Sequence, residues 1–572
     1  MTEMSERIAR QHQRALCGFA LLLMLLGPSP VRSRQLQTQQ VTIAGKARII
    51  SITLEGKRHF KNIILDLDDG RAQLVEAKAG VCRTLRSGMR VQATGSWVAA
   101  SAAARAATGT PRFLVTSVTA SGGLQGKPIV TAGSSGSDMV AAASTATMGG
   151  QPFRPALVAN YLAQRDLSTI IIPFAAIGAD GKACPSTQLP QVPVSQVKQA
   201  IFQEANRDGI TVGSLYNQCS YGKTRLTSLN SLVAPLVKLP CNGTTNDVAW
   251  TFSKCDFDDF NGYADAADEA LRAQGVVLER YKYRVYLVPP STCGFVGLGY
   301  IGCDGSYTCR AWIGAGFWAS PAAIAHELGH NLFLNHANSI NTEGVIQEYG
   351  DMTGIMGYCC DTRCPSPTQA WQLGWLTMQQ LDSASLPPGQ TVQLTLDSQA
   401  VNPQSGLRIN TTSWVAGVDP VFLALRTSER GDKGLASWYS GQVHVYQSPV
   451  TSTYDPRPSL WHGGLNVGDS WTEPTAGLVV RHLGSSGDSA AISVCRIGGA
   501  ETAASCAALR DNDCNGLVGN ADPTCAFLTA AKARQVAAAN RIRRKPSKVI
   551  TNTALARPTA PAPKRRPSKS AR

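Results

Sequence analysis

Apolar residues recur at helical spacing over residues 194–206 and 265–274, so each segment is predicted to form an amphipathic helix. Apolar-rich segments of strand length predict strands at residues 168–174, 283–288 and 309–314, of which 283–288 is expected to be buried in a sheet. Together with the helix described below, these elements predict a mixed α+β or α/β domain, which we place at residues 151–385.

Short apolar segments without helical spacing flank this domain on both sides. Before it, three alternating segments predict a small β-barrel-like domain at residues 34–131. After it, β-rich segments predict an antiparallel, β-sandwich-like domain at residues 386–500. We interpret the N-terminal domain as a propeptide; the alternative is an accessory β-domain that stays attached.

The most specific chemical signal is the motif H-E-x-x-H, with its histidines at His326 and His330. Ser320 supplies an N-cap and Pro321 suits the first turn of a helix. In a helix both imidazoles project from one face, one turn apart, where two neutral imidazoles can hold one zinc ion. Glu327 lies beside them and is placed to act as general base toward a metal-activated water.

A third histidine, His336, follows the motif after six residues, and a Met-containing turn follows at Met356. The spacing resembles the metzincin pattern H-E-x-x-H-x-x-G-x-x-H followed by a Met-turn, and it predicts His336 as third ligand. Phe333 stands where that pattern has glycine. Three outcomes are open: Phe333 adopts the left-handed conformation, a neighbouring asparagine adopts it, or the helix continues. A continuing helix would leave Glu343 or Glu348 as the third ligand.

The wider stretch contains HELGHNL, then NHA, YGD and MG, and closes with AWQLGW at Trp375. Together these segments resemble the gametolysin family of zinc peptidases, which includes the Volvox-type matrix metalloproteases. The resemblance implies a metzincin-like fold and a secreted endopeptidase that acts on cell-wall or extracellular-matrix glycoproteins, often proline-rich ones. It also implies that Met356 forms an apolar floor beneath the zinc. Tyr358 is a candidate fifth ligand or oxyanion donor by the same resemblance.

The N-terminus has the features of a secreted chain. Basic residues precede a short apolar run that ends in Gly-Pro-Ser-Pro, which predicts a signal peptide at residues 1–33. This run is too short to span a membrane comfortably, and no other segment approaches that length. Small polar residues at 132–150 predict a flexible linker, where we expect activation cleavage.

Sixteen cysteines in such a chain predict disulfides formed in an oxidising compartment. Cys82 has no neighbouring partner, and a lone thiolate is a good fourth zinc ligand. Cys82 is therefore a candidate cysteine switch that silences a zymogen; the alternative is a plain thiol. The sequons at Asn242 and Asn410 are candidate N-glycosylation sites. A cysteine cluster after the Met-turn is expected to brace it: Cys359, Cys360 and Cys364.

Residues 501–526 contain a calcium-like loop clamped by cysteines. Oxygen-bearing side chains at loop positions 1, 3, 5 and 12, with glycine at position 6, match EF-hand spacing. These side chains are Asp511, Asp513, Asn515 and Asp522. The alternative interpretation is a disulfide-stapled acidic turn without a metal.

Residues 527–572 are predicted to form a basic, disordered tail. From Pro523 onward the chain has no Asp or Glu and thirteen Lys and Arg residues, which account for most of the net charge of +15. In a secreted protein such a tail suits anionic polysaccharide. The alternative is a solvated tail without a partner, and nucleic-acid binding is not expected.

These features predict a secreted, multi-domain zinc endopeptidase. The competing hypothesis is a non-catalytic matrix or cell-wall adhesion protein with a degenerate peptidase domain. Phe333 distinguishes the two, because catalysis becomes doubtful if this residue keeps His336 from the metal and no carboxylate replaces it.

Overall fold

The computed structural model describes much of the chain between residues 40 and 543. The described ranges are 40–54, 58–67, 72–77, 90–98, 112–120, 156–159, 165–206, 209–245, 248–291, 293–303 and 307–543. The predicted signal peptide, Cys82 and the predicted linker lie outside the described residues.

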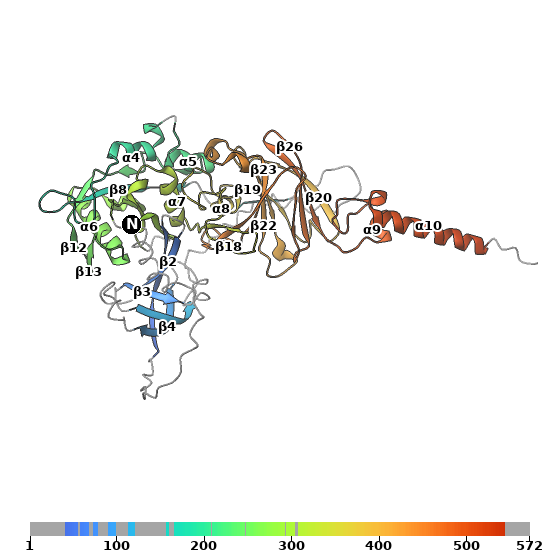
Figure 1. Cartoon of the computed structure of the whole chain (residues 1–572), viewed down its shortest axis with the longest axis horizontal. Coiled ribbons are helices and arrows are strands. Elements are labelled where there is room, and N and C mark those ends of the chain that lie inside the picture. The colour runs from blue at the N-terminus through green and yellow to red at the C-terminus, as the bar shows by residue number, and fades with distance from the viewer. Residues whose placement is uncertain are drawn as a thin grey trace, which may run out of the picture. The chain divides into compact units, whose positions relative to one another are not determined.

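A mixed sheet forms the centre of the predicted peptidase region (Figure 1). Four strands are parallel to their neighbours, in the order β10 (Leu232–Val233), β8 (Thr169–Ala176), β14 (Tyr283–Leu287) and β16 (Cys309–Ile313). The next strand, β15 (Phe295–Tyr300), is antiparallel to β16. A short strand, β11 (Val237–Leu239), also pairs with β8. The buried strands β8, β14 and β16 are the ones predicted from apolar runs, as expected for strands covered on both faces.

Helices cover both faces of this sheet. Along β8, Ile171 belongs to an apolar cluster with residues of α4 (Val194–Ile201), α5 (Val212–Cys219), α7 (Pro321–Asn331) and α8 (Pro367–Gln372). The alternate residues Ile170 and Ile172 belong to a second cluster, with residues of α6 (Phe257–Ala273). Since successive side chains of a strand point to opposite faces, α6 lies on one face and the other helices on the opposite one. The prediction of a mixed α/β domain is confirmed.

Two helix boundaries differ from the sequence prediction for local reasons. The helix predicted over 194–206 ends at Ile201 and continues only as a 3₁₀ turn, Gln203–Ala205. Helix α6 begins before the predicted start, because Asp256 and Asp259 form a capping box at its N-terminus.

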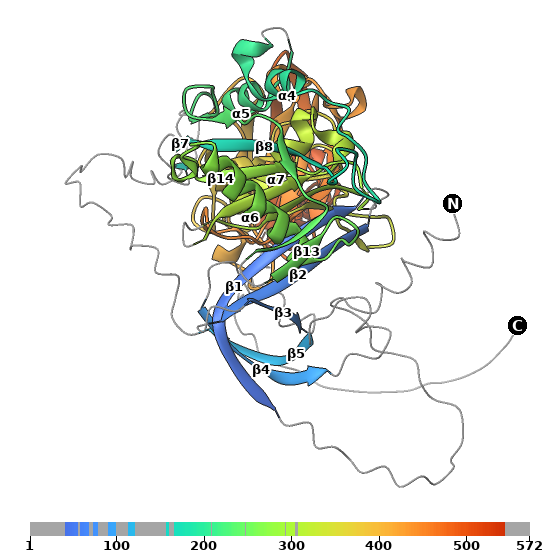
Figure 2. The same ribbon diagram turned by 90° about the vertical axis from the view of Figure 1, so that its left-hand side faces the viewer.

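Five N-terminal strands pair in a closed ring. The strands are β1 (Val41–Leu54), β2 (Arg58–Leu67), β3 (Ala72–Ala77), β4 (Arg90–Val98) and β5 (Arg112–Ala120). Pairing runs from β1 to β2, β3, β5 and β4, and β4 returns to β1. We call these strands the N-terminal ring. The second half of β1 leaves the ring's β1–β4 pairing and extends with β2 toward the central sheet (Figure 2).

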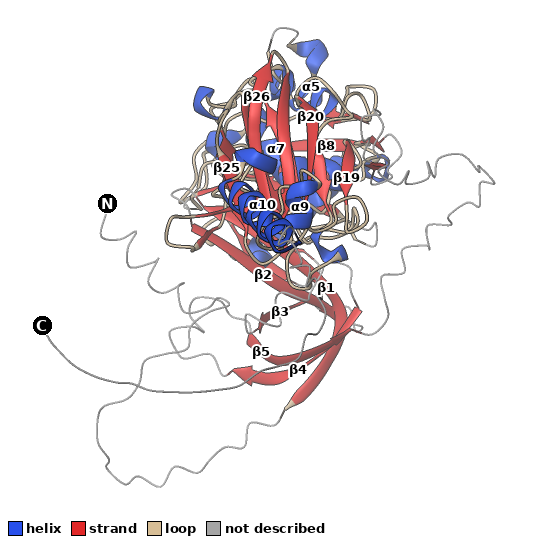
Figure 3. Ribbon diagram, turned by 90° about the vertical axis from the view of Figure 1, so that its right-hand side faces the viewer, coloured by secondary structure: helices blue, strands red, loops and turns tan. Residues whose placement is uncertain are grey.

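Two further sheets share one apolar cluster in the C-terminal half (Figure 3). The larger has the order β18 (Ile346–Gln347), β17 (Ala337–Ile340), β24 (Ser459–Leu465), β23 (Gln442–Gln447), β22 (Val421–Arg426), β21 (Leu407–Ile409), β19 (Thr377–Leu381) and β6 (Ala156–Ala159). The smaller has the order β20 (Gln390–Asp397), β27 (Ser489–Arg496), β26 (Leu478–Ser486) and β25 (Ser470–Glu473). Strands from both sides of residue 385 thus join one sheet. Two short pairs complete the strands: β7 (Arg165–Asp166) with β9 (Thr224–Arg225), and β12 (Asn242–Thr245) with β13 (Val248–Thr251).

Residues from Gly499 onward form a separate compact unit, which contains α9 (Ala503–Ala507) and α10 (Pro523–Arg543). The prediction of disorder from residue 527 is wrong for the part of the tail up to Arg543. An alanine-rich run without internal proline favours a helix, and the Asp522 carboxylate accepts hydrogen bonds from the backbone N–H groups of Thr524 and Cys525 at 2.7 and 2.9 Å.

Every cysteine among the described residues is disulfide-bonded. Two bonds follow the Met-turn: Cys364 pairs with Cys219 of α5, and Cys359 pairs with Cys360. The cysteine cluster therefore braces the turn, as predicted, through α5. Other pairs are Cys184–Cys241, Cys255–Cys293, Cys303–Cys309 and Cys506–Cys525.

Among the described helices, none combines the length and apolarity needed to cross a membrane.

Candidate metal centre

The H-E-x-x-H motif lies on helix α7, whose residues are almost all buried. Its N-cap, Ser320, accepts a hydrogen bond from the backbone N–H of Ala323 at 3.2 Å, and proline follows at the first turn, as predicted. At Gly329 a β-carbon would lie 2.6 Å from the sulfur of Met356, so glycine lets the Met356 side chain pack directly against the helix. Met356 is fully buried against this helix; its role as the floor of the site stays a prediction.

Phe333 itself adopts the left-handed conformation, with φ of +72°. Its N–H donates to the carbonyl of His330 at 2.9 Å, and the N–H of Leu334 donates to the carbonyl of Gly329 at 3.1 Å. These two bonds form a Schellman motif, which ends α7 and reverses the chain. Of the three outcomes open from the sequence, the structure has the first, and the helix does not continue.

A buried ring compensates this backbone strain. Only 3% of Phe333 is exposed. Its ring packs edge-on against Tyr454, with centroids 5.1 Å apart. It also fills the space in which a β-carbon at Gly302 would lie. Burial of a phenylalanine stabilises by more than the roughly 1–2 kcal/mol that a left-handed residue costs.

The reversal brings His336 to the other two histidines. One ring nitrogen from each of His326, His330 and His336 lies within 4.8 Å of the others, and the Nε2 atoms of His330 and His336 are 3.1 Å apart. Each Nδ1 contacts an oxygen: His326 the Ile355 carbonyl at 2.8 Å, His330 the Leu334 carbonyl at 2.9 Å, and His336 the Glu348 carboxylate at 2.6 Å. If each Nδ1 donates its proton to that oxygen, all three Nε2 lone pairs remain for one ion.

The donor set fits zinc. His326 Nε2 and Glu327 Oε2 are fully buried polar atoms without a hydrogen-bond partner in the protein, and such atoms are costly unless a ligand satisfies them. Burial lowers the pKa of His326 to about 4, so this imidazole is neutral at pH 7, as a ligand must be. Three imidazoles are an established donor set for catalytic zinc.

Glu327 is enclosed between α7 and β15. A β-carbon at Gly297 would lie 2.3 Å from Glu327 Oε1, and one at Gly299 would lie 3.0 Å from Oε2. Two glycines in β15 therefore make room for the carboxylate. Burial raises the pKa of Glu327 well above its ordinary value, which is the direction that suits a group that must take up and release a proton.

Sequence reasoning missed two side chains beside the histidines. Glu348 entered it only as an alternative ligand, whereas its carboxylate contacts His336 Nδ1 and orients that ring. The Tyr349 ring lies with its centroid 3.7 Å from that of His336 and 5.9 Å from that of His326. Both follow β18 directly, and the only signal was the YGD segment, which begins at Tyr349 and directly follows Glu348. Glu343, the other alternative ligand, is exposed.

The turn that supports the histidines is held by buried polar groups of the larger C-terminal sheet. Arg426 donates to the carbonyl of Thr353 at 2.9 Å and pairs with Asp432 at 2.8 Å. The same carboxylate accepts from the backbone N–H of Cys364 at 2.7 Å. The Thr353 hydroxyl lies 2.6 Å from the Tyr446 hydroxyl. The segment around Met356 is thus fixed by β22 and β23.

Tyr358 lies on the outer side of this turn. The residue is 38% exposed, and its carbonyl accepts a hydrogen bond from Arg363. Its role as fifth ligand or oxyanion donor stays a prediction.

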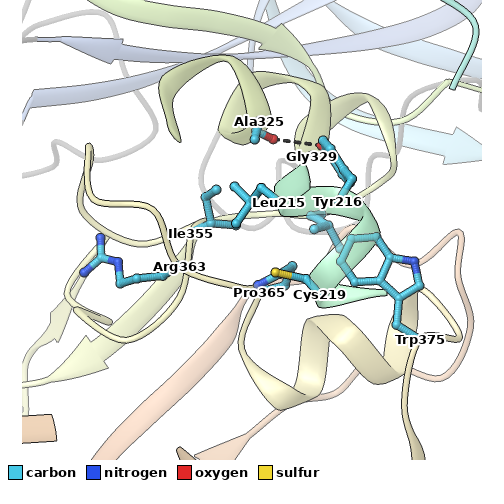
Figure 4. A pocket seen from close by; sticks show the side chains of 10 residues that line it. Leu215, Tyr216, Cys219, Ala325, Gly329, Ile355, Arg363, Pro365 and Trp375 are labelled. Atoms are coloured by element: carbon cyan, nitrogen blue, oxygen red, sulfur yellow. Dashed lines mark hydrogen bonds between the residues drawn. The ribbon is translucent and has the colours of Figure 1, made fainter. Parts of the chain in front are cut away.

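A small, mainly apolar cavity lies against α7 at Ala325 and Gly329, the residues that precede His326 and His330 in the chain (Figure 4). Leu215, Ala325, Gly329 and Trp375 are among its lining residues, and the Tyr216 hydroxyl donates to the Ala325 carbonyl at 2.9 Å. Hydrogen bonding from Tyr216 fixes the helix one residue before His326.

In the predicted calcium loop, two of the three carboxylates lie close to one residue that the sequence analysis did not include. Oxygens of Glu501, Asp511 and Asp513 lie within 4.8 Å of one another. Asn515 donates to Asp522 at 2.5 Å, and that carboxylate also caps α10. Calcium binding stays a prediction. Of the candidate glycosylation sites, Asn242 is exposed on β12, and Asn410 is partly buried and accepts from Thr412.

Two comparisons bear on this site. A family model described as gametolysin peptidase M11 matches residues 176–457. A curated protein, autolysin from Chlamydomonas reinhardtii, is 24% identical over 458 residues, which cover 63% of this chain and 70% of autolysin. The matched region contains all three histidines, Glu327 and the Met-turn.

Proposed function

The chain belongs to the gametolysin peptidase family through residues 176–457, and on this premise we propose that it is a secreted zinc-dependent endopeptidase. Its proposed substrates are cell-wall or extracellular-matrix proteins, including proline-rich glycoproteins. The observation that carries the proposal is the convergence of three imidazoles beside one buried carboxylate. The disulfides of the described residues fit an oxidising compartment.

His326, His330 and His336 would hold the ion. When bound, zinc supplies Lewis-acid chemistry and lowers the pKa of a coordinated water to roughly 7. Glu327 takes a proton from the attacking water and passes it to the leaving amine. Its raised pKa supports both transfers, since a carboxyl group with an ordinary pKa would hold the proton too weakly at neutral pH.

The substrate is proposed to bind as an extended segment along β15. This strand lies beside Glu327, and peptides commonly bind sheets by adding a strand at an edge. The name of the relative, autolysin, denotes self-lysis, and we extend that sense to this chain as action on wall or matrix proteins.

Exchange of Glu327 for Gln tests the proposal, in the chain without residues 1–150. Because Glu327 is not among the grouped histidine ligands, the variant should keep its zinc and lose at least a thousandfold in kcat/KM toward unfolded β-casein. Glu343→Gln is the matched control, since it makes the same change on an exposed residue, and it should retain activity. Undiminished cleavage by Glu327→Gln would refute the assignment.

The adhesion hypothesis would gain if Phe333 kept His336 from the metal and no carboxylate replaced it, but His336 lies with the other two histidines. The cysteine switch at Cys82, calcium at Asp511, and polysaccharide binding by the basic tail accompany the proposal as accessory predictions. Occupancy of Asn242 and Asn410 by glycan belongs with them.

A further inference from the structure

The antiparallel strand β15 has two edges, and both are covered. One edge pairs with β16, where the N–H of Gly314 donates to the carbonyl of Val296 at 3.0 Å. A substrate strand added to β15 would therefore have to take the other edge, opposite β16. Since Gly297 and Gly299 lie against Glu327, a peptide along this edge would pass beside the catalytic carboxylate.

The second half of β1 occupies that edge. It runs antiparallel to β15, with Ser51 opposite Gly299 and Thr53 opposite Gly297. The N–H of Ile301 donates to the carbonyl of Ile49 at 2.9 Å. The side chain of Ile301 is buried in the apolar cluster of the N-terminal ring. This contact therefore combines backbone pairing with apolar burial.

We propose that β1 is an intramolecular competitor of the substrate, so that the N-terminal ring inhibits the peptidase by strand addition to β15. The inference rests on the proposed function and adds its regulation. In the intact chain, β1 occupies the edge of β15. The ligand that replaces it is an extended, unfolded polypeptide. A tethered competitor acts at a high effective concentration, of the order of millimolar for short linkers, so it blocks the edge even if its intrinsic affinity is weak.

The register identifies the backbone groups to change. Along a strand with an antiparallel neighbour on each side, every second residue directs its N–H and C=O groups to one neighbour. The residues between them direct theirs to the other neighbour. Because Ile49 accepts from Ile301, Ser51 and Thr53 are expected to turn their N–H groups toward β15, and Ile50 and Ile52 toward β2. Proline at residue 51 or 53 then removes one backbone N–H that donates to β15. The N–H groups of β1 that donate to β2 remain.

The experiment measures binding without cleavage. Full-length, zinc-loaded chain carrying Glu327→Gln is titrated with fluorescent β-casein, an unfolded proline-rich protein. Ser51→Pro should bind it at least tenfold more tightly than Ser51→Ala, which keeps the backbone donor. Thr53→Pro against Thr53→Ala repeats the comparison near the end of β1, where a proline disturbs the ring least.

Hydrogen exchange supplies a second test on the unmodified chain. The amides of Gly297, Gly299 and Ile301 should be protected, and Ser51→Pro should expose that of Gly299. Equal affinity of the proline and alanine variants, with zinc content and near-UV circular dichroism intact, would overturn the inference, as would unprotected β15 amides. Failure of the proposed function would give a different result. β-Casein would still bind more tightly to Ser51→Pro than to Ser51→Ala, but the chain that keeps Glu327 would not cleave it.

Discussion

At the scale of residues, Phe333 shows how local preference and tertiary packing compete. The sequence placed a residue with a β-carbon where the pattern calls for glycine, and backbone preference alone favoured a different turn residue. The structure keeps Phe333 in the left-handed region because its ring is buried against Tyr454, more than a hundred residues later in the chain. Spacing cannot reveal such a contact.

Replacement of Phe333 by Gly and by Ala separates the two effects. Both variants lose the buried ring and should be less stable than the parent chain by about 3–5 kcal/mol. Glycine also relieves the left-handed strain, so Phe333→Gly should exceed Phe333→Ala in stability by about 1 kcal/mol, the reverse of the usual order. Urea unfolding midpoints measure the difference. A more stable alanine variant would show that the position is not strained.

The motif residues themselves were predictable, because His326 and His330 follow from helical spacing alone. Glu348 and Tyr349 were not, because they reach His336 from the turn that follows the β17–β18 hairpin, whose pairing is not encoded in a short motif. Sequence spacing thus identifies the groups that hold the ion better than it identifies the groups that orient them.

At the scale of elements, composition predicted the strands that are buried on both faces. It did not predict which strands pair with one another. The sequence indicates β8, β14 and β16 as apolar runs, but nothing in it pairs β1 with β15 or β6 with β19, since these contacts join distant segments. Helix α10 was missed because positive charge outweighed its alanine-rich composition in the prediction.

The contact between β23 and β24 predicts an acid-sensitive element. His444 is fully buried, with Nε2 directed at the Tyr439 carbonyl and Nδ1 accepting from the Trp461 indole. Burial lowers its pKa to about 3 from 6.5. A depressed histidine pKa means that the unfolded chain binds the proton more tightly, so stability is complete above 6.5 and falls as the pH drops toward 3.

Between pH 7 and pH 5, His444 alone should lower the free energy of unfolding by about 2 kcal/mol. In His444→Gln this contribution disappears, so the urea midpoint should fall less over the same interval than in the parent chain. The quantity to compare is the change in urea midpoint between pH 7 and pH 5 in each chain. This change does not include the constant cost of the substitution, whereas the midpoints themselves do. Equal falls would refute the role of His444.

At the scale of the whole molecule, the site depends on segments from most of the chain up to residue 498. Helix α7 supplies two histidines, the C-terminal sheet fixes the Met-turn through Arg426, and β15 encloses Glu327 while it pairs with the N-terminal ring. The division into separate domains stays a prediction, and strands on both sides of residue 385 build one sheet.

The most direct test of the central claim is the zinc content of the purified chain without residues 1–150, measured together with β-casein cleavage in the parent and in His336→Ala. If the three histidines hold one zinc ion, the parent chain should contain one zinc, a chelator should abolish cleavage and added zinc restore it, and the variant should lose both zinc and cleavage. Chelator-resistant cleavage, or a folded His336→Ala variant with full zinc and activity, would contradict the three-histidine centre.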